Sequence, residues 1–257
     1  MMLVLAALAA AAASLLTFFS GFGLVTVLTP LFLLCFPAPT AVAAVAGVHL
    51  LNNVVKFSLV GRSADWGVAV RFGLPAVVAS AAGAAVLGVL AIGEPWFEWS
   101  LGRISGTMRP ASTLLGALMV AFAVLELRPP RGLTGTGLVF GGLLSGFFGG
   151  LTGHQGALRS AFLVRAGLEP RAFVATGVAI ALGVDLIRLS VYGASLDLAG
   201  IESEWPLLAA TTTGAVAGSI LGAQWIGKVT IVRVQQVVAV MLLVTGLVVG
   251  LGVGGDW

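Results

Sequence analysis

Long apolar runs almost free of charge recur along the whole of this 257-residue chain, and they limit what it can fold into. A helix of about 20 apolar residues is long enough to cross a lipid bilayer. Hydrophobic residues make up 59% of the chain and charged residues 9%, whereas soluble domains average about 25% charged. The sequence therefore predicts an all-α, polytopic helical protein of the cell membrane (inner or plasma membrane).

The N-terminal stretch MMLVLAALAAAAASLLTFF is as apolar as a signal peptide. It lacks the positively charged start of one, because the first basic residue of the chain is Lys56. We interpret it as a retained membrane segment. Cys35 is the only cysteine, which excludes a disulfide framework or a thiolate metal cluster. We expect no cofactor and no metal site. The net charge is only +3, and basic residues standing singly in loops indicate topology control rather than nucleic-acid binding.

Glycines, prolines and charges divide the chain into apolar segments. Two of these segments are too short to span a bilayer, and each follows a longer one across a glycine-rich break. The breaks are SGFG at 20–23 and GGLTGHQG at 149–156. Two sets of five segments predict a duplication within one transport domain, with repeats over 1–127 and 128–257. The segments are 3–20, 24–36, 40–60, 67–92, 111–126, 134–149, 156–166, 171–192, 206–226 and 232–252.

Polar residues support this duplication. The stretch NVVKFSLVG at 53–61 matches DLIRLSVYG at 185–193, and the positions outside the matched pairs given below are apolar in both stretches. Chance similarity between apolar helices does not explain matched polar positions. The matched pairs are Asn53 with Asp185, Lys56 with Arg188, Ser58 with Ser190, and Gly61 with Gly193.

Loop charges predict how the repeats are oriented. If each broken pair of segments enters and leaves on one side, eight cations gather on one face and two on the other. If each pair crosses once, loop cations divide four against six, which specifies nothing. The positive-inside rule therefore favours an inverted repeat with both termini outside. Loops 61–66, 127–133, 166–170 and 227–231 are then cytoplasmic, and loops 93–110 and 193–205 are outside.

The glycine breaks are the strongest candidates for a binding site. A broken helix exposes free N–H groups and the positive end of its dipole, and glycine lets a ligand approach the backbone. Irregular backbone at membrane depth is tolerated where it lines a cavity. We expect an anion-accepting cavity lined by Gly21, Gly23, Gly153, His154 and Gln155, with Arg159 as its cation. Alternatively, His154 is a structural histidine and Arg159 snorkels to the basic face.

Ionisable residues in the middle of apolar segments are the other candidates. His49, Asn53, Lys56 and Arg188 are predicted to take part in substrate binding, and Asp185 in proton or ion coupling. Purely structural roles for these residues are the alternatives. His49 can serve packing, Lys56 and Arg188 can snorkel, and Asp185 can simply neutralise Arg188 one turn away.

No zinc-protease motif, cysteine-rich metal spacing or phosphate-binding loop occurs, so we expect no catalytic residues and no enzyme. A secondary transporter of a small anion is our first interpretation. A proton- or ion-coupled carrier of another small solute and a non-transporting membrane scaffold are the alternatives. Beyond the substrate and the lipid bilayer we expect no nucleic-acid partner. The oligomeric state stays open, a homodimer included.

The duplicated pattern resembles the sulfite exporter TauE/SafE family of membrane transporters. The resemblance rests on SGFGLVTVLTPLFLL at 20–34 and GFFGGLTGHQGALRSAFLVRAGLEPRAFVATGV at 146–178, and it covers about 15–250. The compact glycine triplet usual in that family is interrupted in both halves. The resemblance implies outward transport of sulfite or an organosulfonate.

Overall fold

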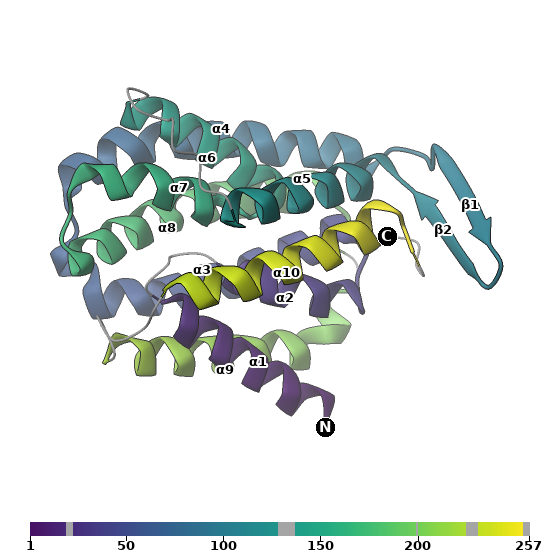
Figure 1. Cartoon of the computed structure of the whole chain (residues 1–257), viewed down its shortest axis with the longest axis horizontal. Helices are drawn as coiled ribbons and strands as arrows, with labels where there is room; N and C mark the ends of the chain where they lie inside the picture. The colour runs from purple at the N-terminus through teal and green to yellow at the C-terminus, as the bar shows by residue number, and fades with distance from the viewer. Residues whose placement is uncertain (19–22, 128–136, 199, 225–230, 254–257) are drawn as a thin grey trace.

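A computed structural model describes residues 1–18, 23–127, 137–198, 200–224 and 231–253, which contain ten α-helices and one β-hairpin (Figure 1). The helix bounds follow the predicted segments closely. The helices are α1 (Met2–Thr17), α2 (Leu24–Leu33), α3 (Ala38–Val60), α4 (Trp66–Ala91), α5 (Pro110–Leu127), α6 (Leu138–Thr152), α7 (Gln155–Leu163), α8 (Pro170–Ser195), α9 (Trp205–Ala223) and α10 (Ile231–Gly250). The strands are β1 (Phe97–Leu101) and β2 (Ile104–Met108), and 3₁₀ turns occur at η1 (Gly61–Ser63), η2 (Val164–Ala166) and η3 (Glu202–Glu204).

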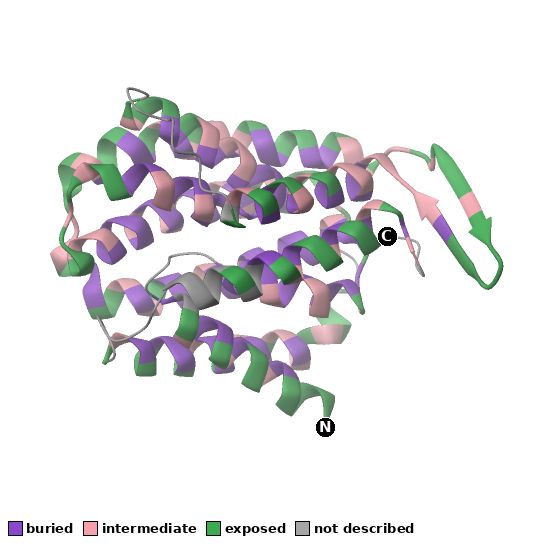
Figure 2. Cartoon of the chain, viewed as in Figure 1, coloured by how far each residue is buried: buried purple, intermediate pink, exposed green. Residues whose placement is uncertain are grey.

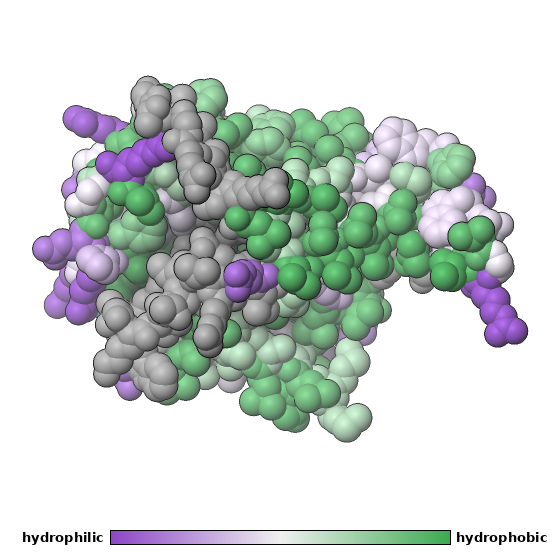
Figure 3. Space-filling model, viewed as in Figure 1, coloured by the Kyte–Doolittle hydropathy of each residue, from purple (hydrophilic) through white to green (hydrophobic). Residues whose placement is uncertain are grey.

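Several of the helices have the length and the apolar surface of membrane spans. Within the part of the chain that the structure describes, four helical stretches are long and apolar enough to cross a bilayer unaided, namely Ala38–Ser63, Trp66–Ala91, Pro170–Ser195 and Glu202–Ala223. Large apolar side chains are exposed along the bundle, for example Val70, Leu74 and Val78 on one face of α4 (Figures 2 and 3). A soluble protein rarely exposes such a continuous apolar face. The prediction of an all-α, multi-pass membrane protein is confirmed.

Both predicted breaks interrupt the helices. Gly153 ends α6 with a φ of 81°, and Gly23 precedes α2 with a φ of 109°. Both values lie in the left-handed region, which glycine adopts at little cost and other residues rarely adopt. Each break is therefore a position where the sequence requires glycine. The predicted site residue Gly21 lies outside the described residues.

Stripes of glycine join the first helix of each half to the fourth helix of the other half. Gly142, Gly146 and Gly150 on α6 lie against the backbone of Phe72, Ala76 and Ser80 on α4. In the same way, Gly214 and Gly218 on α9 lie against Ala7 and Ala11 on α1. In both pairs the residue numbers rise together, so the two helices are parallel. Small residues allow this close backbone packing, which stabilises helix pairs in lipid.

Two pairs of helices at matching positions in the proposed halves run antiparallel. In α3 and α8, the Thr40 side chain donates to the Asp197 carbonyl at 3.0 Å, and the Asn53 side chain donates to the Asp185 carboxylate at 3.0 Å. The numbers therefore rise along α3 as they fall along α8. The pair α5 and α10 does the same, because Gly116 lies at Gly250 and Val120 lies at Gly246.

The hairpin corrects the expectation that 93–110 is only a loop. Apolar pairs such as Phe97 with Met108 and Leu101 with Ile104 lie on one face, and Glu98 with Thr107 lies on the other. The hairpin extends past the ends of the helices (Figure 1). The chain after α10 holds one side of it, because Trp99 Nε1 donates to the Leu251 carbonyl at 2.9 Å.

The two ends of the bundle differ in charge. The Asp65 N–H donates to Thr176 Oγ1 at 2.9 Å, which brings the loops after α3 and before α8 to one end. Hydrophilic side chains gather there, at the left of Figure 3. Among the described residues this end carries Arg62, Arg71, Arg165 and Arg171 with the acidic Asp65 and Glu169, while Glu94, Glu98, Arg103, Arg109, Asp197, Glu202 and Glu204 belong to the other end. The cytoplasmic assignment of the basic end stays a prediction.

Candidate functional site

The two broken helices open onto one small buried pocket. Its walls come chiefly from the first turns of α2 and α7, with single side chains from α3, α5 and α10. The first N–H groups of a helix have no acceptor within it, so both first turns offer free donors here. The pocket volume of about 20 Å³ holds about one water molecule. The lining residues are Gly23, Val25, Thr26, His49, Phe122, Gly153, His154, Gln155, Gly156, Ala157 and Leu242.

His154 and Gln155 bring unpartnered polar groups to this pocket. Both side chains are buried, and within the described chain neither imidazole nitrogen of His154 and neither amide atom of Gln155 has a hydrogen-bond partner. The His154 ring stacks on Phe122, with centroids 6.1 Å apart. A buried polar group without a partner is costly. This cost is offset if a ligand in the pocket supplies the missing partners.

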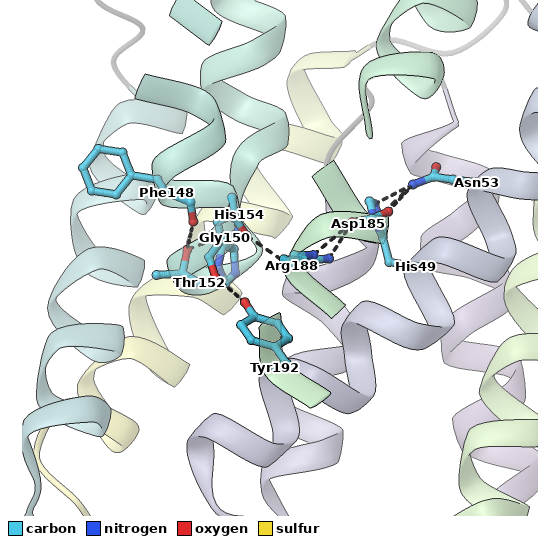
Figure 4. A network of polar contacts seen from close by, with 10 residues as sticks. His49, Asn53, Phe148, Gly150, Thr152, His154, Asp185, Arg188 and Tyr192 are labelled. Atoms are coloured by element: carbon cyan, nitrogen blue, oxygen red, sulfur yellow. Dashed lines mark hydrogen bonds and ion pairs between the residues drawn. The ribbon is translucent and has the colours of Figure 1, made fainter. Parts of the chain in front are cut away.

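A charged network lies beside the pocket and joins α3 to α8 (Figure 4). Asp185 Oδ2 lies 2.7 Å from His49 Nδ1 and accepts from Asn53 Nδ2 at 3.0 Å. Its other oxygen, Oδ1, accepts from Arg188 Nε at 3.0 Å and lies 2.8 Å from Arg188 Nη2. Asp185 and Arg188 are fully buried, so their opposite charges largely cancel inside the bundle. His49 is the member of this network that also lines the pocket.

The same network secures the second break. Arg188 Nη1 donates to the Gly149 carbonyl at 3.3 Å, and the Tyr192 hydroxyl donates to the Gly150 carbonyl (Figure 4). Both carbonyls belong to the last turn of α6, where acceptors commonly lack partners within the helix. The Gly149 carbonyl also accepts from the Gly153 N–H at 2.9 Å, so Arg188 is its second donor. A cation at this end also complements the helix dipole. Arg188 and Tyr192 therefore fix the position of the break relative to α8.

Lys56 and Arg159 are buried but lie outside the lining of this pocket. Lys56 Nζ lies 5.3 Å from the centroid of the Phe18 ring, just after α1, and no carboxylate of the described chain lies within ion-pair distance of it. Arg159 lies on the second turn of α7, and its side chain lies against Gly177 of α8. A Cβ built at Gly177 would be 3.5 Å from Arg159 Nε. Direct anion binding by either residue stays a prediction.

Sequence reasoning missed several contributors. Thr26 in α2 and the apolar pair Phe122 and Leu242 line the pocket, and Tyr192 holds α6. A separate buried cluster joins α1, α3 and α9, because Ser219 Oγ donates to Asn52 Oδ1 at 2.7 Å and lies 2.7 Å from Ser14 Oγ. Of these residues, the repeat could have indicated Thr26 alone. Thr26 lies three residues after Gly23, just as the pocket residue Gly156 lies three residues after Gly153.

The arrangement has groups that can bind a small anion. Helix N-termini and neutral side-chain donors surround the pocket, and no group of three metal-ligating side chains gathers among the described residues. No curated protein and no solved structure matches the chain. The family model for the sulfite exporter TauE/SafE matches residues 6–249, almost the full length, and the chain therefore belongs to this family of membrane transporters.

Proposed function

We propose that the protein exports a small sulfur-containing anion such as sulfite or an organosulfonate, and that the anion binds between the first turns of α2 and α7. The observation that carries the proposal is the convergence of two helix N-termini on one buried pocket. Each N-terminus acts as roughly half a positive charge and presents free N–H donors. Family membership supports the sulfur-containing anion.

Side-chain donors complete the proposed site. An oxyanion leaving water loses strong hydrogen bonds, and this desolvation is costly unless the protein replaces them. His154 and Gln155 have atoms available for this purpose, and Thr26 adds a hydroxyl from the opposite wall. Arg188 is a cation beside the break, because a Cβ at Gly153 would lie 2.7 Å from its Nη1 atom. Its positive charge favours an anion there, although Asp185 offsets much of it.

Alternating access follows from an inverted relation between the halves 1–127 and 128–257. The antiparallel pairs α3 with α8 and α5 with α10 support this relation, because an axis in the membrane plane reverses every helix that it relates. The pocket is too small for a sulfur oxyanion, so its walls must separate to admit one. We interpret the structure as an occluded state between inward-open and outward-open states.

A matched pair of threonine variants tests the proposed site. Thr26 lines the pocket, whereas Thr29 on the same helix donates to the Val25 carbonyl at 2.7 Å and does not line it. Thr26→Val should weaken binding of sulfite and ethanesulfonate roughly fivefold to tenfold, as expected for one lost hydrogen bond of about 1–1.5 kcal/mol. Thr29→Val should leave affinity unchanged. The measurements are calorimetric titration of purified protein and anion flux in proteoliposomes.

The outcome depends on which variant loses activity. Equal affinities for Thr26→Val and the wild type, with intact transport, would place the anion elsewhere. Equal losses of affinity in Thr26→Val and Thr29→Val would mean that any change in α2 weakens binding. The variants would then no longer support this pocket as the anion site. Binding of carboxylates or phosphate in preference to both sulfur anions would overturn the proposed substrate class.

A further inference from the structure

His49 differs from every other polar residue of the pocket in belonging to two groups at once. Its ring lines the pocket, and its Nδ1 atom lies 2.7 Å from Asp185 Oδ2. The ring is buried, so its protonation state matters to anything that binds beside it. Resting on the anion site proposed above, we propose that His49 is a proton-binding site and that one proton enters the pocket together with each anion.

Hydrogen bonding fixes which nitrogen of His49 carries the first proton. Asp185 pairs with Arg188, so its carboxylate is ionised and can only accept hydrogen bonds. The short contact to Asp185 therefore requires a proton on His49 Nδ1. In neutral imidazole the other nitrogen, Nε2, then has a lone pair and no proton.

In this tautomer neutral His49 interacts unfavourably with an anion in the pocket. A lone pair cannot donate to an oxyanion, whereas a protonated Nε2 is both a donor and a positive charge. His154 differs, because neither of its ring nitrogens has a partner within the described chain. It can turn an N–H toward the pocket while neutral. Proton coupling therefore belongs to His49, and His154 is its natural control.

Charges of both signs lie near His49, so an added anion changes how readily the ring is protonated. From α8, Asp185 favours the imidazolium and Arg188 opposes it. On α3 itself Lys56 lies two turns away and opposes it too, and Asn53 Nδ2 lies 3.1 Å from Nδ1 and 3.5 Å from Nε2. His154, from the α6–α7 break, is the other titratable side chain lining the pocket, and Thr26, Phe122 and Leu242 contribute no charge from α2, α5 and α10. An anion adds the negative charge that favours protonation.

Linkage gives the expected measurement. If His49 is neutral in the free protein and protonated in the complex, affinity for the anion falls about tenfold for each unit of rising pH. Ethanesulfonate keeps a constant charge between about pH 5 and 8, where histidine titrates, so its own protonation does not interfere. Calorimetry in two buffers with different ionisation enthalpies counts the protons taken up. About one proton per bound ethanesulfonate is expected at a pH between the pKa of His49 in the free protein and its pKa in the complex.

Two variants separate His49 from its neighbour. His49→Gln retains an amide donor for Asp185 but cannot be protonated, so binding should lose its pH dependence and its proton uptake. His154→Gln should keep both while changing affinity by a constant factor. If His49→Gln fails to fold, proton uptake by the wild type and by His154→Gln still tests the proposal.

The results distinguish this inference from the proposed function. Ethanesulfonate binding without proton uptake, and with the same affinity at every pH, overturns proton coupling while leaving the anion site intact. Proton uptake that persists in His49→Gln also overturns it. If neither ethanesulfonate nor sulfite binds at any pH, the proposed function fails and this inference fails with it.

Discussion

Replacing Arg188 by methionine should strongly destabilise the protein, because it removes one member of a fully buried ion pair. Arg188 Nη2 lies 2.8 Å from Asp185 Oδ1, and neither side chain is exposed. The variant leaves a buried carboxylate with only His49 and Asn53 as donors and removes the bond to the Gly149 carbonyl. Breaking a buried pair in this way costs about 3–5 kcal/mol.

The double variant Asp185→Asn/Arg188→Met tests whether unpaired charge causes the loss. It removes both charges, and neutral replacements of buried pairs are often no less stable than the original. We expect it to be more stable than Arg188→Met by about 2–3 kcal/mol, which is a coupling energy typical of contacting residues. Arg171→Met, an exposed arginine in the first turn of the same helix, should change stability by less than about 0.5 kcal/mol.

Thermal unfolding of the detergent-solubilised protein, followed by tryptophan fluorescence, measures these differences. At about 2–4 °C per kcal/mol for a chain of this size, Arg188→Met should lower Tm by roughly 6–20 °C. Additive effects in the double variant would refute the reasoning, because they would mean that the two charges do not depend on each other. A Tm unchanged in Arg188→Met would refute it as well.

Two further predictions concern packing and topology. In Gly146→Leu the new side chain would meet the Ala76 backbone, so α4 and α6 should separate and the monodisperse peak in size-exclusion chromatography should be lost. Gly193→Leu is the control, because a side chain there enters open space and should be tolerated. Equal elution of the two variants would contradict this prediction. With Cys35 replaced by alanine, an impermeant maleimide should label Ser100→Cys but not Ser63→Cys in intact cells, and the reverse pattern would invert the proposed topology.

The helices were predictable because a bilayer leaves few options. Every backbone N–H and C=O in lipid needs an internal partner, so an apolar run of sufficient length has to be helical. Segment 67–92 accordingly appears as α4 over Trp66–Ala91. The glycine breaks were equally readable, because Gly23 and Gly153 adopt a backbone conformation that other residues avoid.

The hairpin escaped prediction because its signal is short and lies outside the apolar segments. FEWSL and ISGTM are five residues each, and water imposes no requirement comparable to that of lipid. Their alternation of apolar and polar residues is the correct strand pattern. Alternation over five residues is weak evidence beside long apolar runs, and the pairing of β1 with β2 gives it meaning only afterwards.

The site was only partly predictable, because sequence does not show which way a side chain faces. Thr26 and Thr29 occur three residues apart in one apolar helix, yet one lines the pocket and the other bonds to its own backbone. The distance from the break along the chain favoured Arg159 as the cation. That choice stays a prediction. Packing of α8 across α6 also brings Arg188, another predicted binding residue, to Gly149 from 39 residues away.

The contact between Asn53 and Asp185 says most about how the two halves are joined. These residues occupy matching positions of the proposed repeats, and Asn53 Nδ2 donates to Asp185 Oδ2 at 3.0 Å. Two equivalent residues can touch only if the axis relating them passes close by. Two carboxylates there would repel each other, so divergence to one amide and one carboxylate makes the contact favourable. A rocking motion about that axis moves this pair least. In the proposed transport cycle, the proposed proton and anion sites beside it would therefore stay assembled while the ends of the bundle open in turn.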